Sequence, residues 1–199
     1  MILDAAREVL ATRGHENFSL RKLAENIGYS PGTIYLYFRD KHDVLHALVE
    51  ESFDKLLSEL ETSLVSSDDL VTRVKTGLRT YIHFGLKNPN HYRFAFLVTP
   101  PPESDRDGNP RRGHQPHPAY YMLKQDVDAS IKSGAFRQMD VECATQALWC
   151  AAHGVTSLLI VRPEFPWVEK EKLINRVIDS AVNSLLPLVP RSGSIPAKE

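Results

Sequence analysis

The sequence predicts an all-α protein, and three features of the chain indicate this class. Apolar residues recur at spacings of three and four, strand-like alternation is scarce, and Gly or Pro residues separate most of the segments. The chain has 199 residues, of which 42% are hydrophobic and 25% charged, and its net charge is −1. This balance is typical of an ordinary globular protein and excludes a disordered, fibrous or strongly basic chain.

The first two predicted helices are short. Residues 2–10 place an apolar stripe on one helical face, and this helix is expected to end near Gly14, where a left-handed glycine can close it. A second helix is expected to begin after Ser19, whose hydroxyl can cap it, and to end where Gly28 turns the chain.

The third predicted helix is very short and completes a recognisable pair with the second. Ser30 can accept from the free N–H groups at its start, Pro31 fits its first position, and the helix is expected to run through Phe38. The methyl side chain of Ala24 and the conformational freedom of Gly28 allow the two helices to cross closely. This spacing predicts a helix-turn-helix, whose second helix enters the DNA major groove.

The rest of the chain continues the helical pattern. Each of the later segments carries an apolar stripe, and the predicted helices cover residues 41–64, 71–88, 92–97, 120–134, 144–161 and 168–186. Residues 99–118 contain six of the thirteen prolines and are expected to form a long exposed loop.

These elements predict three parts. Residues 1–46 are expected to form a three-helix helix-turn-helix domain that binds DNA, and residues 47–190 a helical domain that binds an effector and dimerises. Residues 191–199 are expected to be a disordered tail, because Pro, Gly, Ser and charged residues dominate the end of the chain.

The start of the third helix carries the chemistry that DNA contacts need. The free N–H groups and the helix dipole at the segment from Ser30 to Thr33 favour a phosphate, although Pro31 itself has no N–H. Gly32 lets the backbone approach without a side chain in the way. Tyr35 and Tyr37 can donate hydroxyls to phosphates, while Thr33 offers a hydroxyl and a methyl group to a base edge.

The stretches ILDAAREVLATRG and FSLRKLAENIGYSPGTIYLYFRDKHDVL together resemble the DNA-binding domain of the TetR family of bacterial repressors, over residues 1–50. The resemblance implies that six residues lie where the family contacts DNA: Arg21, Ser30, Thr33, Tyr35, Tyr37 and Lys41. Leu36 departs from the family pattern, which often has a polar or basic residue there, so one base contact is lost or becomes apolar.

The C-terminal part carries a second resemblance. Residues 148–160, LWCAAHGVTSLLI, are similar to the Trp then His-Gly pattern of one branch of the family's sensor domains. The resemblance implies that the last two helices form a four-helix interface with their copies. A dimer is also expected because one short recognition helix supplies too few contacts for a specific operator.

The charge of the N-terminal part is the main evidence against DNA binding. Residues 1–55 hold seven Arg and Lys against nine Asp and Glu, whereas residues 13–41 hold five against three. The cations are therefore concentrated on the segment expected to face DNA.

Aromatic side chains of the second domain could line an effector cavity between helices or could form ordinary core. The set consists of Tyr81, Phe84, Tyr92, Phe94, Phe96, Tyr120, Tyr121 and Trp149. Among the ligand-binding candidates, His153 would supply a polar contact. The alternative interpretation is that His153 lies in a core or interface, where other protein groups satisfy its hydrogen bonds.

Other residue types favour simple structural roles. Cys143 and Cys150 fit small buried hydrophobic positions better than a disulfide framework or redox sensor, which favours a reducing cytoplasm. His42 and His46 have the spacing of two zinc ligands, but a solvated pair is expected, as for two histidines in the proline-rich loop. No metal or cofactor is predicted.

Membrane insertion and catalysis are not predicted either. Residues 144–161 lack formal charges but include five polar side chains, so a buried helix fits better than a membrane span. No signal peptide is expected, because acidic residues occupy the start of the chain. The chain carries no GxSxG, HExxH or glycine-rich phosphate loop, so an enzyme in the C-terminal helices lacks support.

The sequence thus predicts a cytoplasmic, one-component transcriptional regulator. It is expected to bind a pseudo-palindromic operator in double-stranded DNA as a homodimer, to repress transcription, and to be released by a small-molecule effector. The alternative is a helical ligand-binding or interaction module whose DNA-binding surface has decayed, as the acidic balance of residues 1–55 would suit.

Overall fold

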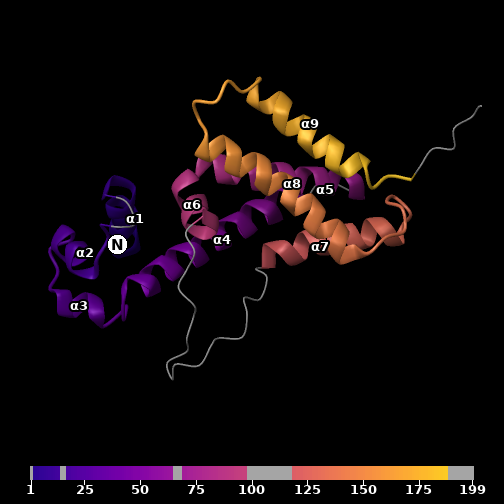
Figure 1. Cartoon of the computed structure of the whole chain (residues 1–199). Helices are drawn as coiled ribbons and strands as arrows, with labels where there is room; N and C mark the ends of the chain where they lie inside the picture. Colours follow the sequence, from indigo (N-terminus) through magenta and orange to yellow (C-terminus); the bar gives the residue numbers. More distant parts are fainter. Residues whose placement is uncertain (1, 14–16, 65–68, 98–117, 188–199) are drawn as a thin grey trace, which may run out of the picture. The chain divides into compact units, whose positions relative to one another are not determined.

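A computed structural model describes residues 2–13, 17–64, 69–97 and 118–187, which form helices and no strand within these ranges (Figure 1). The all-α prediction is confirmed. The helices of the described residues are α1 (Ile2–Arg13), α2 (Leu20–Asn26), α3 (Pro31–Tyr35), α4 (Lys41–Leu64), α5 (Leu70–Lys87), α6 (Pro89–Leu97), α7 (Pro118–Lys132), α8 (Val141–Val161) and α9 (Lys170–Asn183). The predicted proline-rich loop, apart from Pro118, and the predicted tail lie outside the described residues.

The chain packs as two compact units, each defined by its own internal contacts. One unit contains Met1–Thr62 with His83–Ala119, and the other contains Ser63–Ile82 with Tyr120–Glu199. The predicted domain boundary at residue 46 falls inside α4, which is a continuous helix. The division at that residue therefore stays a prediction.

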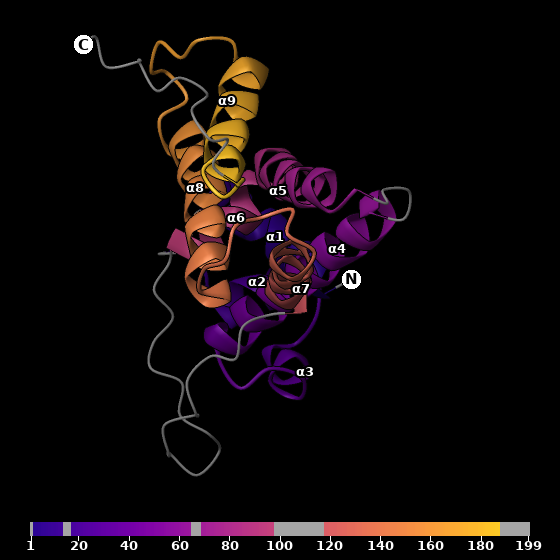
Figure 2. The same ribbon diagram turned by 90° about the vertical axis from the view of Figure 1, so that its right-hand side faces the viewer.

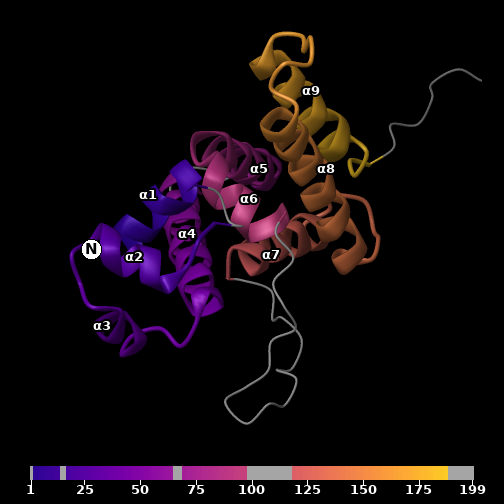
Figure 3. The same ribbon diagram turned by 60° about the vertical axis from the view of Figure 1, so that its left-hand side comes forward.

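The N-terminal helices of the first unit share one small core. Helices α1, α2 and α3 gather around the first turns of α4 (Figure 3). The side chains that are completely buried between them are Ala6, Leu23, Ala24, Ile34 and Val44. The small residue predicted at the crossing of α2 and α3 is thus part of this core, because a methyl group lets the two helices approach closely.

The predicted turn and cap residues act as expected. The Ser19 hydroxyl accepts from the N–H of Lys22 at 3.3 Å, and the Ser30 hydroxyl accepts from the N–H of Thr33 at 3.1 Å. Gly28 has a φ of +69°, in the left-handed region that glycine adopts without strain. Local sequence signals therefore set the geometry between α2 and α3.

Gly28→Ala is expected to lower the free energy of unfolding by about 1 kcal/mol, because alanine resists the positive φ. A Cβ at this position would meet no atom within 4 Å, so the cost is purely conformational. Gly32→Ala is the matched control: its Cβ would meet only the Ser30 hydroxyl, at an ordinary 3.7 Å, and the free energy of unfolding should stay equal or rise. Denaturant unfolding of both variants measures the difference, and equal losses would contradict the strained-turn explanation.

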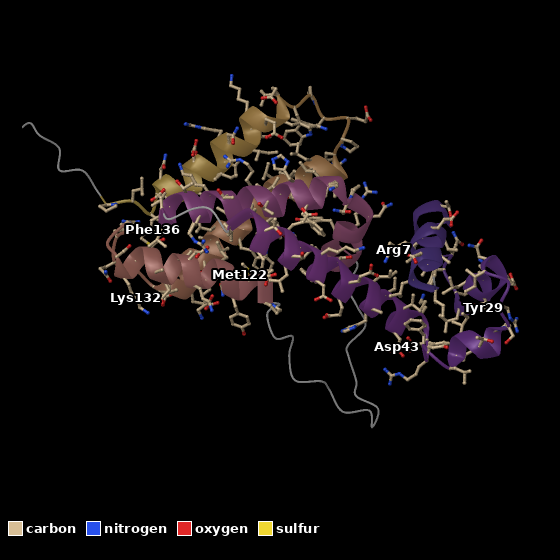
Figure 4. All side chains as sticks on the ribbon, turned by 180° about the vertical axis from the view of Figure 1, so that it is seen from behind. Arg7, Tyr29, Asp43, Met122, Lys132 and Phe136 are labelled. Atoms are coloured by element: carbon tan, nitrogen blue, oxygen red, sulfur yellow. The ribbon has the colours of Figure 1, made fainter. Side chains whose placement is uncertain are left out.

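The second unit is organised around α8 and α9, which pack side by side (Figure 2). Polar contacts fix α5 against this pair: Lys75 donates to Asp179 at 2.7 Å, and Arg79 donates to Asn175 at 2.8 Å. The nearby ammonium group lowers the pKa of the Asp179 carboxyl. Phe136, in the connection from α7 to α8, is almost completely buried and anchors that turn (Figure 4).

Several predicted helix bounds were wrong. Helices α6, α7 and α8 begin at Pro89, Pro118 and Val141, not at residues 92, 120 and 144, α7 ends at Lys132, not at 134, and α9 begins at Lys170, not at 168. The C-terminal ends of α3 and α9 also differ from the prediction. Helix α3 ends at Tyr35, because the N–H groups of Tyr37 and Phe38 both bond to the carbonyl of Ile34 and close a turn instead. Helix α9 ends at Asn183 and does not reach residue 186. There the chain turns, and the carbonyl of Leu185 accepts from the N–H of Arg137 at 2.9 Å. At α9 a long-range bond follows the helix end, whereas at α3 the closing bonds come from the residues two and three positions after the helix.

Helix α8 is the one helix among the described residues that is long and apolar enough to cross a membrane by length and composition. A core helix of a soluble protein passes the same test, and one face of α8 is buried in the second unit. The residues of that face are Ala144, Thr145, Leu148, Ala152, Val155, Thr156, Leu159 and Ile160. Packing against protein accounts for the apolar residues of this face.

Candidate nucleic-acid interface and aromatic cluster

Helix α3 is held on the first unit by one face only. Ile34 is completely buried and Phe38 is half-buried, and both lie on the same side of the turn. The Ser30 and Thr33 hydroxyls lie 2.9 Å apart, in hydrogen-bond contact, in addition to the cap described above. The anchored face fixes which side of α3 points away from the core.

The structure places most of the predicted DNA contacts on this outer surface. Tyr35 and Tyr37 are 56% and 69% exposed, while Thr33 and Lys41 are half-buried. The other predicted contacts are also exposed: Arg21, Ser30, Pro31 and Gly32. The accessible helix-turn-helix residues thus extend from the first turn of α2 across α3 to the start of α4.

Two features of this region were missed by the sequence analysis. The Asp40 carboxylate accepts from the N–H groups of His42 and Asp43, at 2.7 and 3.1 Å, and so caps α4. The Arg39 guanidinium donates two bonds to Asp43, at 2.8 and 2.9 Å. An aspartate directly before the helix and an i, i+4 charge pair were the available signals. Together they fix the link between α3 and α4.

An ion-pair network joins α1 to α4. Arg7, labelled in Figure 4, bonds to Asp4 on its own helix at 2.5 Å and also to Glu51 on α4. Lys55 approaches the same Glu51 carboxylate at 2.8 Å. The hydrogen bond from Lys55, assisted by the charge of Arg7, lowers the pKa of Glu51. The long helix α4 is thus tied to the helix-turn-helix by charge as well as by apolar packing.

The predicted aromatic set separates between the two units. In the first unit Tyr92 and Phe96 have ring centroids 4.9 Å apart, and Phe96 meets Phe53 edge-on at 5.5 Å. Tyr92 and Phe84 are buried, so these rings serve as core. Phe53 was not among the predicted ring residues, and the side chain of Phe94 lies outside the described residues.

The second unit holds a different aromatic group, which carries polar atoms. The Tyr81 hydroxyl and Nδ1 of His153 lie 3.1 Å apart, and the His153 and Trp149 rings meet edge-on at 6.1 Å. Tyr120 contacts both Trp149, at 5.8 Å, and Tyr121, at 6.1 Å. Partial burial lowers the pKa of His153, so its imidazole is neutral at pH 7 and the bond to Tyr81 joins two neutral groups.

A charged contact closes one end of this aromatic group. The Tyr120 hydroxyl donates to the Glu142 carboxylate, which also accepts from Lys124 at 2.7 Å and from Gln146 at 2.9 Å. The bonds from Lys124 and Tyr120 lower the pKa of Glu142 to about 2. Burial, with the bond to Glu142, raises the pKa of Tyr120 to about 12. Near neutral pH the phenol therefore stays protonated and donates to an ionised carboxylate.

The burial predicted for the cysteines was wrong. Cys143 and Cys150 are both exposed on the described chain. They lie seven residues apart, on the side of α8 that turns away from its buried face, because seven residues make nearly two helical turns. Leu158 and Val161 are exposed on the same helix, so α8 has an accessible surface rich in apolar groups.

Both parts of the chain match models of known protein families. Residues 2–48 match the family model described as "Bacterial regulatory proteins, tetR family". Residues 74–181, more than half of the chain, match "Tetracyclin repressor-like, C-terminal domain".

Curated relatives align over part of their length. The "Fatty acid metabolism regulator protein" of Bacillus subtilis (strain 168) is 33% identical over 90 residues, which are 45% of each chain. The "Nucleoid occlusion factor SlmA" of Haemophilus influenzae (strain PittGG) is 32% identical over 77 residues, 39% of this chain and 35% of the relative. The chain thus spans less than half the length of these relatives.

Solved structures share the fold over nearly the whole chain. A protein with unknown function from Rhodococcus sp. RHA1 has a TM-score of 0.78 at 19% identity, with 94% of each chain covered. The fatty acid degradation regulator FadR from Bacillus halodurans has a TM-score of 0.69 at 18% identity, covering 91% of this chain and 92% of that one. With both family models matched in order along the sequence, the chain belongs to the TetR family of bacterial regulatory proteins.

Proposed function

We propose that the protein is a one-component transcriptional repressor that binds a pseudo-palindromic operator as a homodimer and leaves it when a small molecule binds. The observation that carries this proposal is the exposed outer surface of α3, anchored from beneath by the buried Ile34. A short helix held in this way can enter the major groove and present its side chains to base edges. The proposed contacts are Arg21, Ser30, Pro31, Gly32, Thr33, Tyr35, Tyr37 and Lys41.

The dimer is proposed to form through α8 and α9. Leu158 and Val161 are exposed on α8, and Phe165 and Val168 are exposed in the connection to α9. Burial of these apolar side chains against a second copy would remove them from water and stabilise the dimer. Two subunits would then place two α3 helices on successive major grooves of the operator.

The effector is proposed to contact the aromatic group of the second unit. Tyr81, Tyr121, Trp149 and His153 combine ring faces with a hydroxyl and an imidazole, which suits a small molecule with an apolar body and one polar group. The sequence also predicted three ring residues that pack in the first unit: Phe84, Tyr92 and Phe96. Because they pack in that core, they are less suitable as effector contacts. Fatty acyl compounds are the first effectors to test, because the Bacillus subtilis relative is named as a fatty acid metabolism regulator.

Release would follow a shift between two populations of the dimer. In one state the two recognition helices have the spacing that fits the operator, and in the other state they do not. An effector that binds the second state more tightly shifts the dimer toward it and so lowers operator affinity. The size of this decrease is limited by the ratio of the effector's affinities for the two states. Helix α4 is the proposed lever, because the Arg7–Glu51 ion pair ties it to α1.

Selection of bound duplexes from a random DNA library tests the proposal. The protein should enrich an inverted repeat, and the Thr33→Ala, Tyr35→Ala double variant should not, because two proposed contacts per subunit are lost. Gln125→Ala, at an exposed site on α7, is the control and should enrich the same repeat. No enrichment by the unchanged protein at low salt would favour the decayed-module alternative.

The salt dependence of operator binding gives a second measure. Arg21, Lys22 and Lys41 supply about three phosphate contacts per subunit, so the slope of log K against log salt should be roughly −5 for a dimer. Arg21→Gln should reduce its magnitude to about 3.5, because two contacts per dimer are lost. Lys132→Gln, at an exposed site on α7 outside the proposed interface, is the control and should leave the slope unchanged. A slope near zero would contradict phosphate contacts by these cations.

A further inference from the structure

Leu36 is the most exposed of the large hydrophobic side chains among the described residues. It is 83% exposed, more than either neighbouring tyrosine. Its backbone angles of −69° and −27° are helical, although it follows the last residue of α3. Single exposed apolar side chains are common on protein surfaces, so what distinguishes Leu36 is its place on the proposed DNA-facing surface, between the exposed Tyr35 and Tyr37.

The geometry of α3 fixes the direction of this side chain. Successive residues of an α-helix are 100° apart, so Leu36 points about 200° away from the buried Ile34. Thr33 precedes Leu36 by three residues and shares its face. The N–H groups of Tyr37 and Phe38 both bond to the Ile34 carbonyl at 3.0 Å, which holds the backbone around Leu36 in place. The side chain is therefore presented at the centre of the outer surface, between Tyr35 and Tyr37.

The chemistry of leucine restricts what it can contact there. It has no hydrogen-bond donor or acceptor, so it cannot bind a phosphate or the polar atoms of a base edge. The apolar group that base edges offer in the major groove is the C5-methyl of thymine. We propose that Leu36 contacts this methyl group in each operator half-site and so acts as a specificity-determining residue. This inference rests on the function proposed above.

The test removes the methyl group alone. Each thymine of the selected operator is replaced in turn by deoxyuridine, and the Kd is measured for the unchanged protein and for Leu36→Ala. One thymine per half-site should be sensitive: deoxyuridine there should weaken binding of the unchanged protein about fourfold for one half-site and about 15-fold for both. In Leu36→Ala the same replacements should change the Kd less than twofold.

Leu36→Met serves as the conservative control, because methionine restores an apolar side chain of similar size and should restore sensitivity to deoxyuridine. Thymines that all tolerate deoxyuridine, or equal sensitivity in Leu36→Ala, would overturn the Leu36 inference while leaving the regulator proposal intact. A selection that enriches no repeat would instead overturn the proposed function itself.

Discussion

Leu158→Glu is expected to convert the protein from a dimer into a folded monomer. Leu158 is 51% exposed on the single chain, so the glutamate side chain fits without disturbing the second unit. In the proposed dimer the same position lies at the interface, where an unpaired carboxylate from each subunit would lose its water. Operator affinity should fall on the order of 100-fold or more, because each half-site then binds separately. Analytical ultracentrifugation and operator titration measure the two effects.

Gln125→Glu is the matched control for this experiment. Gln125 is exposed on α7 and lies outside the proposed interface, so the variant should remain a dimer with unchanged operator affinity. Thermal unfolding separates a lost interface from a lost fold, since monomeric Leu158→Glu should keep its helical circular dichroism. Leu158→Glu that remains dimeric at low micromolar concentration would show that this face of α8 is not the interface.

Sequence signals predicted the helices well where the signal is local. The bounds of α4, Lys41–Leu64, were predicted correctly, because an amphipathic stripe and its ends lie in consecutive residues. Ser19 and Ser30 were identified as caps because a cap bonds within its own helix start. The end of α3 was predicted wrongly, because the turn that Tyr37 and Phe38 close on the Ile34 carbonyl is not revealed by the side-chain pattern of residues 36–38.

Burial was harder to predict than helix position. Helix α8 is apolar around its circumference, so the sequence could not tell which face packs inside the unit, and the exposure of Cys143 and Cys150 followed from that ambiguity. Core and surface rings also look alike in a sequence. Tyr92 is buried beside Phe96, whereas Trp149 stays partly exposed, and only packing distinguishes them.

The site shows the same division between local and tertiary information. The helix-turn-helix pattern identified residues that the structure places on one accessible surface, because turn glycine, cap serine and buried Ile34 all lie within a few positions. Leu36 was read as a lost or apolar contact, since its residue type alone does not show its exposure. The direction of its side chain follows from the anchoring of Ile34 on the opposite face.

Ile34→Ala is expected to have the largest effect on stability within the helix-turn-helix. Its side chain is completely buried, and its removal leaves a cavity beneath a helix of five residues that has few other anchors. The free energy of unfolding should fall by about 2–4 kcal/mol. Operator binding should be lost with it, because α3 is no longer held in position. The amides of Tyr37 and Phe38, which bond to the Ile34 carbonyl, should exchange with solvent much faster.

Leu36→Ala provides the comparison at the residue that directly follows α3, on the side opposite Ile34. It removes an apolar side chain of similar size that is already in water, so the free energy of unfolding should change by less than about 0.5 kcal/mol. The two variants therefore distinguish two roles: Ile34 anchors α3 to the core, and Leu36 is the proposed contact with operator DNA. Equal destabilisation by both would mean that α3 is not anchored through Ile34. Unchanged exchange at Tyr37 and Phe38 in Ile34→Ala would mean that the turn after α3 does not depend on this buried side chain.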